Sequence, residues 1–233
     1  MLIGPQNLAE NARFVRLRIA AAARAAGRSP EDVTLVAVTK GHGVDAVQAA
    51  LACGLDHIGE NYVQEALPKI EAIPQGQAVT WHFIGRLQAN KTRAVAEHFA
   101  WAHSVDRIKI AERLSAQRSF HAPPLNVCLE VNLEGEGSKG GVAPAELIAV
   151  ARAVADLPRL RLRGLMCIPP PVSEPRLQSE RFRRMHDLLE SLRAAGIAAD
   201  SLSMGMSDDF ELAIAEGATH VRIGTALFGP RAG

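Results

Sequence analysis

The sequence predicts an α/β fold, a single (β/α)8 barrel of the triosephosphate isomerase type preceded by an N-terminal helix. Short runs rich in Val, Ile and Leu alternate with longer helical patterns. This alternation indicates a parallel sheet, because each crossover needs a helix to return the chain. There are eight such runs in 233 residues, which suits one closed barrel. We therefore expect one domain over residues 1–233.

The first expected element is an amphipathic helix over Leu8–Ala26. Its apolar pattern is interrupted at helical spacing by Arg13, Arg16, Arg18 and Arg24. Charges at this spacing predict a surface helix and not a membrane span, and no secretory signal is expected.

The eight expected strands follow the helix in order. They are residues 33–39, 56–59, 79–85, 99–105, 125–132, 161–168, 200–204 and 219–224. Helical patterns between them include 45–54, 106–117, 144–158 and 180–196. Pro144 suits a first helical turn, while Gly54, Gly196 and Gly217 suit helix ends. A doubly wound open sheet is the competing arrangement, and the count of eight units favours the barrel.

Composition excludes several classes of function. The net charge of +1 supplies no overall field for nucleic acid or anionic membrane. The arginines of "RLRLRG" and "ERFRRMH" lack an aromatic platform and are interpreted as solvated faces. Cys53, Cys128 and Cys167 are odd in number and widely spaced. They form neither a disulfide framework nor a metal site, and they suit a reducing cytoplasm.

Lys40 is the first candidate functional residue, because it ends the apolar run "VTLVAVT" and precedes "GHG". If Val36 and Val38 point into the barrel, the two-residue period sends Lys40 the same way. Desolvation there lowers the pKa of a lysine and yields a neutral amine that can form a Schiff base with an aldehyde. The alternative is a strand-end lysine that extends into water.

A phosphate-binding site is expected after strands seven and eight, where such barrels usually bind phosphate. After the seventh strand the chain passes through Gly205 into a helix that Ser207 or Asp208 can cap. Ser203 and Ser207 can add hydroxyl groups. Asp208 and Asp209 would repel a phosphate, so we expect them to point away. An ordinary capped helix is the alternative.

The segment "VRIGTALFG" after the eighth strand supplies the other side of this phosphate site. Gly224 and Thr225 can present backbone N–H groups, and Arg222 faces the same way as Gly224 by alternation. A buried arginine needs a partner, either a ligand or a carboxylate. An amine that captures aldehydes, set beside a phosphate site made by two loops, predicts pyridoxal 5'-phosphate as the cofactor.

Several longer motifs carry a family resemblance. They include "AVTKGHG", "HIGENYVQEALPK", "WHFIGRLQANKTR", "VNLEGEGSKGGV" and "LSMGMSDDFELAIAEGATHVRIGTALFG". In this order they resemble the pyridoxal phosphate homeostasis proteins, whose fold is similar to the barrel domain of bacterial alanine racemase. The resemblance runs from about Asn7 to Arg231. Gly41 and Gly43 depart from it, at positions that family members often fill with Thr and Pro.

The resemblance implies a cytoplasmic protein that holds pyridoxal phosphate as an internal aldimine on Lys40. It implies phosphate contacts from Ser203, Gly205, Met206, Ser207, Gly224 and Thr225, and ring contacts from Asn61, His82 and Arg222. Family members are thought to buffer the cofactor or deliver it to apo-enzymes that use it, without established turnover.

The residues themselves favour a carrier over an enzyme. Racemisation needs acid–base groups on both faces of a substrate, and Tyr62 is the only tyrosine. Arg222 would disfavour a protonated ring nitrogen and weaken the cofactor as an electron sink. A racemase-like enzyme of low activity is the alternative function, and a Schiff-base aldolase is a further reading. No pairing helix or extra domain is visible, so we expect a monomer.

The glycine-rich segment at residues 134–142 contains "GEGSKG", which matches the glycine spacing of dinucleotide loops. Glu134 and Glu136 would oppose a pyrophosphate, so we interpret the segment as a mobile lid. "IPPPV" at 168–172 is expected to form a stiffer wall nearby.

Overall fold

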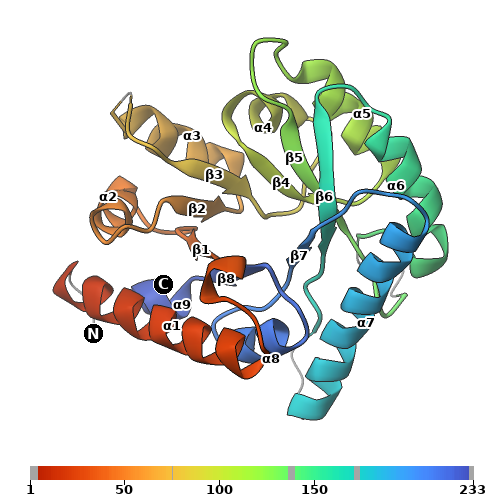
Figure 1. The fold of residues 1–233 in the computed structure, drawn as a ribbon. Helices are drawn as coiled ribbons and strands as arrows, with labels where there is room; N and C mark the ends of the chain where they lie inside the picture. The colour runs from red at the N-terminus through yellow and green to blue at the C-terminus, as the bar shows by residue number, and fades with distance from the viewer. Residues whose placement is uncertain (1–4, 75, 136–139, 171–173, 231–233) are drawn as a thin grey trace.

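A computed structural model describes residues 5–74, 76–135, 140–170 and 174–230. Within these ranges eight parallel strands form a closed barrel in sequence order, with β1 paired to β8 (Figure 1). This confirms the predicted barrel and excludes the open doubly wound sheet. The predicted lid falls mainly on residues 136–139, which lie outside the described residues, as do 171–173 of the predicted wall.

The strand and helix bounds follow the predicted order. The strands are β1 (Thr34–Val38), β2 (His57–Glu60), β3 (Thr80–Phe83), β4 (Trp101–Val105), β5 (Leu125–Glu130), β6 (Leu160–Met166), β7 (Ser201–Ser203) and β8 (His220–Ile223). The helices are α1 (Pro5–Ala25), α2 (Val44–Ala52), α3 (Val63–Ala72), α4 (Thr92–His98), α5 (Ile108–Gln117), α6 (Leu147–Ala155), α7 (Pro175–Ala194), α8 (Phe210–Ala215) and α9 (Thr225–Phe228). Each predicted strand is present, and the observed bounds differ from the predicted ones by two residues or fewer.

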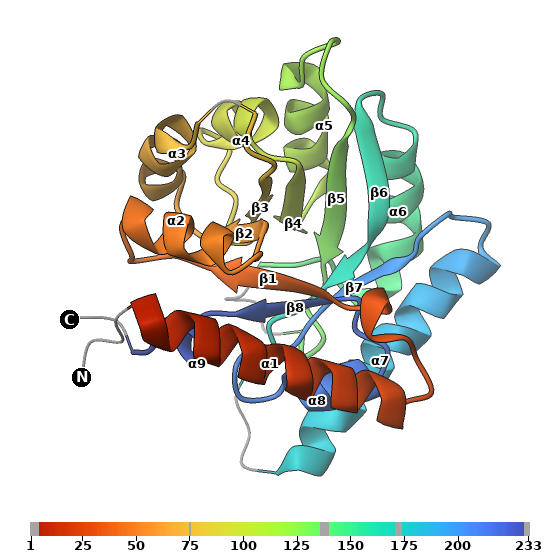
Figure 2. The same ribbon diagram turned by 60° about the vertical axis from the view of Figure 1, so that its left-hand side comes forward.

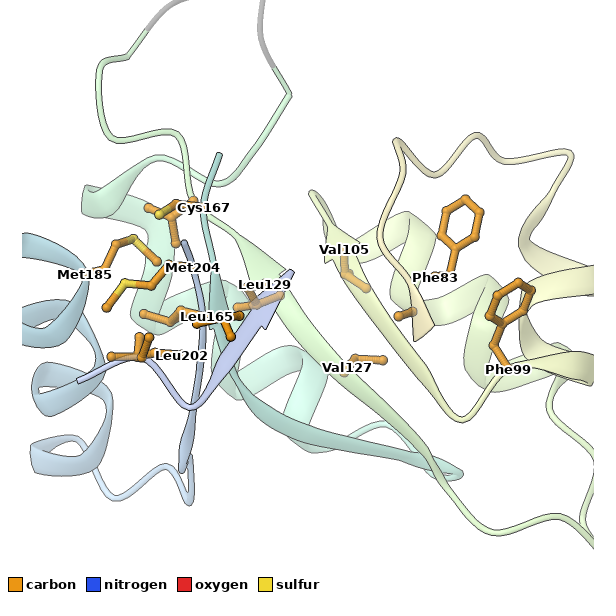
Figure 3. Packing of buried hydrophobic residues seen from close by; sticks show 14 of the residues in the cluster. Phe83, Phe99, Val105, Val127, Leu129, Leu165, Cys167, Met185, Leu202 and Met204 are labelled. Carbon is orange, nitrogen blue, oxygen red and sulfur yellow. The ribbon is translucent and has the colours of Figure 1, made fainter. Parts of the chain in front are cut away.

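The main hydrophobic core lies between the outer face of the barrel and the surrounding helices. Figure 3 shows two parts of it: Met185 of α7 near Met204 and Leu202, and Phe83 near Phe99. The Phe83 and Phe99 rings meet edge to face, with centroids 5.5 Å apart. Burial of this continuous apolar layer is what holds the strand–helix units together.

Helix α1 lies along α8 and α9 on the outside of β8 (Figures 1 and 2). Its buried residues recur every three or four positions, at Leu8, Ala12, Val15, Ile19 and Ala23. This is the apolar stripe of an amphipathic surface helix. Among the helices of the described residues, none has the length and apolar character needed to cross a membrane.

The register of the β1–β8 pair places residues that follow the two strands at the same edge of the barrel. Val36 is paired with Arg222, and Ala37 with Ile223. Lys40 follows β1 and Gly224 follows β8, so both reach the carboxyl edge of the same strand pair. Two ends of the chain therefore meet where the barrel closes.

Candidate functional site

A cavity of about 200 Å³ opens at the carboxyl ends of β1, β2 and β8. Seven of the ten predicted site residues line it: Lys40, Asn61, Met206, Ser207, Arg222, Gly224 and Thr225. His42 and Ile84 also line it and were not predicted, and so does Ile168, the first residue of the predicted wall. Gly205, His82 and Ser203 lie outside the lining.

Lys40 is carried to the cavity by the period of β1. Val38 lines the cavity with Lys40, whereas Ala37 belongs to the outer core. A Cβ added at Gly59 would lie 2.9 Å from Val36 and 3.5 Å from Val38, so both valines face the barrel interior. Alternation along the strand therefore directs Lys40 inward.

A polar cluster, buried on the Thr39 side and exposed on the Gly41 side, holds the backbone on both sides of Lys40. The Lys69 ammonium donates to the Glu60 carboxylate at 2.5 Å and to the Thr39 carbonyl at 2.8 Å. The Thr39 hydroxyl donates to the same carboxylate oxygen at 2.5 Å. On the other side, the Gly41 N–H donates to Glu65 at 2.8 Å. This cluster was not predicted from the sequence, although Glu65 and Lys69 stand four residues apart on α3.

Asn61 presents a buried oxygen to the cavity. Its Oδ1 atom has no hydrogen bond to any described residue. Its backbone is held by Gly85, where an added Cβ would lie 2.0 Å from the Asn61 carbonyl oxygen. An unpaired buried acceptor costs about 1–3 kcal/mol. A bound ligand with a hydroxyl group can satisfy it, which fits the phenolic group of pyridoxal phosphate.

The loop after β7 differs from the predicted helix start. Helix α8 begins at Phe210 with Asp209 as its N-cap, and neither Ser207 nor Asp208 caps it. The Asp209 carboxylate accepts from the Met206 N–H at 2.6 Å and from the Gln178 side chain at 2.7 Å. These bonds turn Asp209 away from the cavity, as expected. Asp208 instead lines the cavity, because residues 207–209 form a turn and not a helix.

Hydrogen bonds join the two predicted phosphate loops, and one of them involves a serine of the cavity lining. The Ala226 N–H donates to the Ser207 hydroxyl at 3.2 Å, which joins the loop after β7 to α9. Gly205 lies behind this contact, where an added Cβ would approach Ala213 to 2.6 Å. Close packing of the loop on α8 thus explains this glycine. Ser207, Gly224 and Thr225 remain at the cavity surface.

Arg222 is buried, with 4% of its surface exposed, and reaches the cavity from β8. One amino group of the guanidinium donates to the Ser203 hydroxyl at 2.7 Å and the other to the Cys167 carbonyl at 2.9 Å. Burial lowers the pKa of Arg222 from its ordinary value. Within the described ranges no carboxylate forms an ion pair with Arg222. Its two hydrogen-bond partners are neutral, and its guanidinium lines the cavity as a hydrogen-bond donor.

His82 lies deeper than predicted, in the barrel interior below the cavity. It is fully buried with His103, while His220 is 6% exposed and His57 is half-buried. Burial lowers the pKa of His82 and of His103 well below the ordinary value, and that of His220 to about 3. This group was not predicted, although the sequence places one histidine in each of four strands.

Comparisons with known proteins agree with this geometry. Residues 6–232 match the family model described as "Alanine racemase, N-terminal domain". The chain is 57% identical over 224 residues to the pyridoxal phosphate homeostasis protein of Pseudomonas aeruginosa, covering 96% of each chain. It is 52% identical over 228 residues to that of Escherichia coli, covering 97% of each.

The chain belongs to the pyridoxal phosphate homeostasis protein family. Among solved structures, PipY of Synechococcus elongatus with pyridoxal phosphate bound superposes with a TM-score of 0.84 at 37% identity, covering 95% of this chain and 100% of PipY. Alanine racemase of Clostridium difficile shares the fold, with a TM-score of 0.70 at 15% identity. The match covers 96% of this homeostasis-family chain and 58% of that racemase.

The Glu60–Lys69 pair yields a stability prediction. Lys69→Met leaves the Glu60 carboxylate buried without its cation, so we expect the free energy of unfolding to fall by about 3–5 kcal/mol. Urea denaturation measures this change. Lys109→Met on the exposed face of α5 is the matched control and should change stability by less than about 0.5 kcal/mol. A loss below about 1 kcal/mol in Lys69→Met would contradict the assigned role.

The interior histidines yield a pH prediction. Their folded-state pKa values are depressed, so below about pH 6.5 the unfolded chain binds protons that the folded chain does not. Their stabilising contribution is present above that pH and is lost as the pH falls, by about 1.4 kcal/mol per pH unit for each fully buried histidine. We expect the free energy of unfolding to be about 3–4 kcal/mol lower near pH 5.5 than near pH 7.5.

Urea denaturation at the two pH values measures this loss. His57, Arg163, Asp200 and Arg222 also face His220. His220→Phe should therefore reduce the loss by roughly a third, since one of three buried histidines is removed. The exposed His98→Gln control should leave it unchanged. Equal stability at both pH values would refute the prediction.

Proposed function

We propose that this chain binds pyridoxal 5'-phosphate in the cavity and acts in cofactor homeostasis by buffering or delivering it. The observation that carries the proposal is the β1–β8 closure, which brings Lys40, Arg222, Gly224 and Thr225 to one cavity of about 200 Å³. The unpaired Asn61 oxygen supports the same ligand. The names of the relatives and the PipY structure with pyridoxal phosphate bound support it further.

Lys40 supplies the attachment point in this proposal. When bound, pyridoxal phosphate supplies an aldehyde, which condenses with a neutral amine to a Schiff base with loss of one water. The Lys40 amine is the nucleophile. Thr39 and Gly41, bonded to Glu60, Lys69 and Glu65, keep its backbone in place.

The remaining lining residues bind and orient the ligand. The hydroxyl groups of Ser207 and Thr225 and the backbone of Gly224 bind the phosphate, with Met206 packing at the entrance. Asn61 Oδ1 accepts a hydrogen bond from the ring hydroxyl, and Arg222 donates to the ring nitrogen. Ser203, Gly205 and His82 support these residues from behind the lining.

A carrier role is supported by what surrounds the cavity. Arg222 is a donor at the ring nitrogen and does not accept its proton, which keeps the ring a poor electron sink. Tyr62 is 56% exposed and lies outside the cavity lining. The single tyrosine therefore supplies no second acid–base group for racemisation in the described lining. We propose a protein that holds and releases the cofactor as a monomer.

The attachment residue is tested by borohydride reduction. The loaded protein should absorb in the visible range, and reduction should add the mass of the reduced cofactor to the peptide that contains Lys40. Lys40→Ala should lose both signals, whereas Lys109→Ala, on an exposed helix face, should keep them. Retention of the label by Lys40→Ala would reject Lys40 as the attachment site.

The carrier role is tested against the racemase-like alternative, which the shared fold with alanine racemase favours. The loaded protein is incubated with L-alanine and the D-isomer is followed by chiral chromatography. We expect a rate no higher than that of free pyridoxal phosphate at the same concentration. A rate at least tenfold above free cofactor would establish the enzyme and defeat the carrier role.

A further inference from the structure

A continuous chain of hydrogen bonds crosses the barrel interior and ends on Arg222. His57 Nδ1 lies 2.9 Å from His82 Nε2, and His82 Nδ1 lies 2.9 Å from His103 Nε2. His103 Nδ1 lies 2.7 Å from the Ser203 hydroxyl, which accepts from Arg222 at 2.7 Å. We call His57, His82, His103 and Ser203 the histidine column. They come from β2, β3, β4 and β7.

The column runs from one end of the barrel to the other. His57 lines a groove at the amino ends of the strands, beside Thr34 and Asp56. Arg222 lines the proposed cofactor cavity at the carboxyl ends. His82 and His103 between them are fully buried.

Arg222 sets the direction of every bond in the column. A guanidinium only donates, so the Ser203 oxygen accepts from Arg222 and its hydroxyl hydrogen is directed to His103 Nδ1. His103 must then carry its proton on Nε2 and donate to His82 Nδ1. By the same reasoning His82 donates from Nε2 to His57 Nδ1. The three imidazoles are thus assigned the Nε2–H tautomer.

The reverse direction fails at Ser203. If His103 Nδ1 carried the proton, Ser203 would accept from both His103 and Arg222. Its own hydroxyl hydrogen would then have no acceptor, since the described residues offer Ser203 no other hydrogen-bond partner. A buried unpaired donor costs about 1–3 kcal/mol, so the direction in which Ser203 donates to His103 Nδ1 is favoured.

The aligned column places its electron-rich end against the guanidinium. Each neutral imidazole turns its bare nitrogen toward Arg222 and its N–H away from it, so successive bonds polarise one another. Burial keeps His82 and His103 neutral, because it lowers the pKa of both. A protonated histidine would instead direct two donors along the column and oppose Arg222.

We propose that the histidine column is a positioning network that orients Arg222 and helps to stabilise its charge, with no carboxylate of the described residues bonded directly to it. The guanidinium can then donate a hydrogen bond to pyridoxal phosphate. This part of the inference rests on the proposed function. His57, His82 and His103 are then positioning residues that act through Ser203. The consequence for the cofactor is tighter binding and a fixed protonation state of its ring nitrogen.

The tautomers are tested in the cofactor-free protein, so this arm does not depend on the proposed function. The ¹⁵N shifts of histidine side chains distinguish Nδ1–H, Nε2–H and doubly protonated rings. We expect Nε2–H for His57, His82 and His103 at neutral pH. An Nδ1–H tautomer or a cationic ring at His103 would overturn the column.

The coupling to Arg222 is tested with variants of His103. His103→Leu removes both nitrogens, whereas His103→Gln retains one acceptor and one donor. We expect the dissociation constant for pyridoxal phosphate to rise at least tenfold in His103→Leu and to stay within about threefold of the parent in His103→Gln. The visible absorbance maximum should shift in His103→Leu alone. The exposed His121→Leu is the matched control and should match the parent in both measurements.

A variant of His57, at the other end of the column, keeps the proposal testable if His103→Leu does not fold. His57→Leu leaves Arg222, Ser203 and His103 intact and removes the last acceptor of the column. In cofactor-free protein it should shift the ¹⁵N signals of His82, His103 and Arg222, while His121→Leu should not. Unchanged signals, or unchanged cofactor binding and absorbance in His103→Leu, would refute the proposal. A parent protein that shows the tautomers but does not bind pyridoxal phosphate would refute the proposed function alone.

Discussion

The pairing of β1 with β8 is the constraint on which the rest of the site depends. Strands from opposite ends of the chain must meet in one register, with Val36 beside Arg222. Such long-range closure costs chain entropy that no local contact returns. The continuous apolar layer between sheet and helices offsets this cost, and α1 completes it over α8 and α9. Lys40 and Gly224 share an edge only because this closure occurs.

Two buried cations are stabilised in different ways, and the difference bears on function. Lys69 pairs with the Glu60 carboxylate behind the cavity, so its charge is compensated within the protein. Arg222 contacts a serine hydroxyl and a backbone carbonyl, both neutral. A guanidinium without a carboxylate keeps more of its capacity to bind a ligand. The first cation supports the backbone at Lys40, and the second faces the proposed cofactor.

The interior of such a barrel is usually filled by branched apolar side chains, whereas this interior also contains buried histidines. Trp101, Cys128 and Met166 form a small apolar cluster there, separate from the main core. The histidines beside them are tolerable because their ring nitrogens are hydrogen-bonded. A half-satisfied network would cost more than an apolar interior, so the column must be complete to be compatible with the fold. Stability of the barrel and the orientation of Arg222 are thereby linked.

The sequence by itself determined the eight strands, the amphipathic first helix and the inward direction of Lys40, because each depends on a local period of two or 3.6 residues. Reasoning from the strand ends also predicted five residues of the cavity lining, and motif resemblance added Asn61 and Met206. The tertiary structure alone decided that His82 lies below the cavity, that Asp209 and not Ser207 caps α8, and that Glu60 meets Lys69. These outcomes depend on strand register and on which neighbours a side chain meets after closure. Local sequence patterns carry no information about such distant partners.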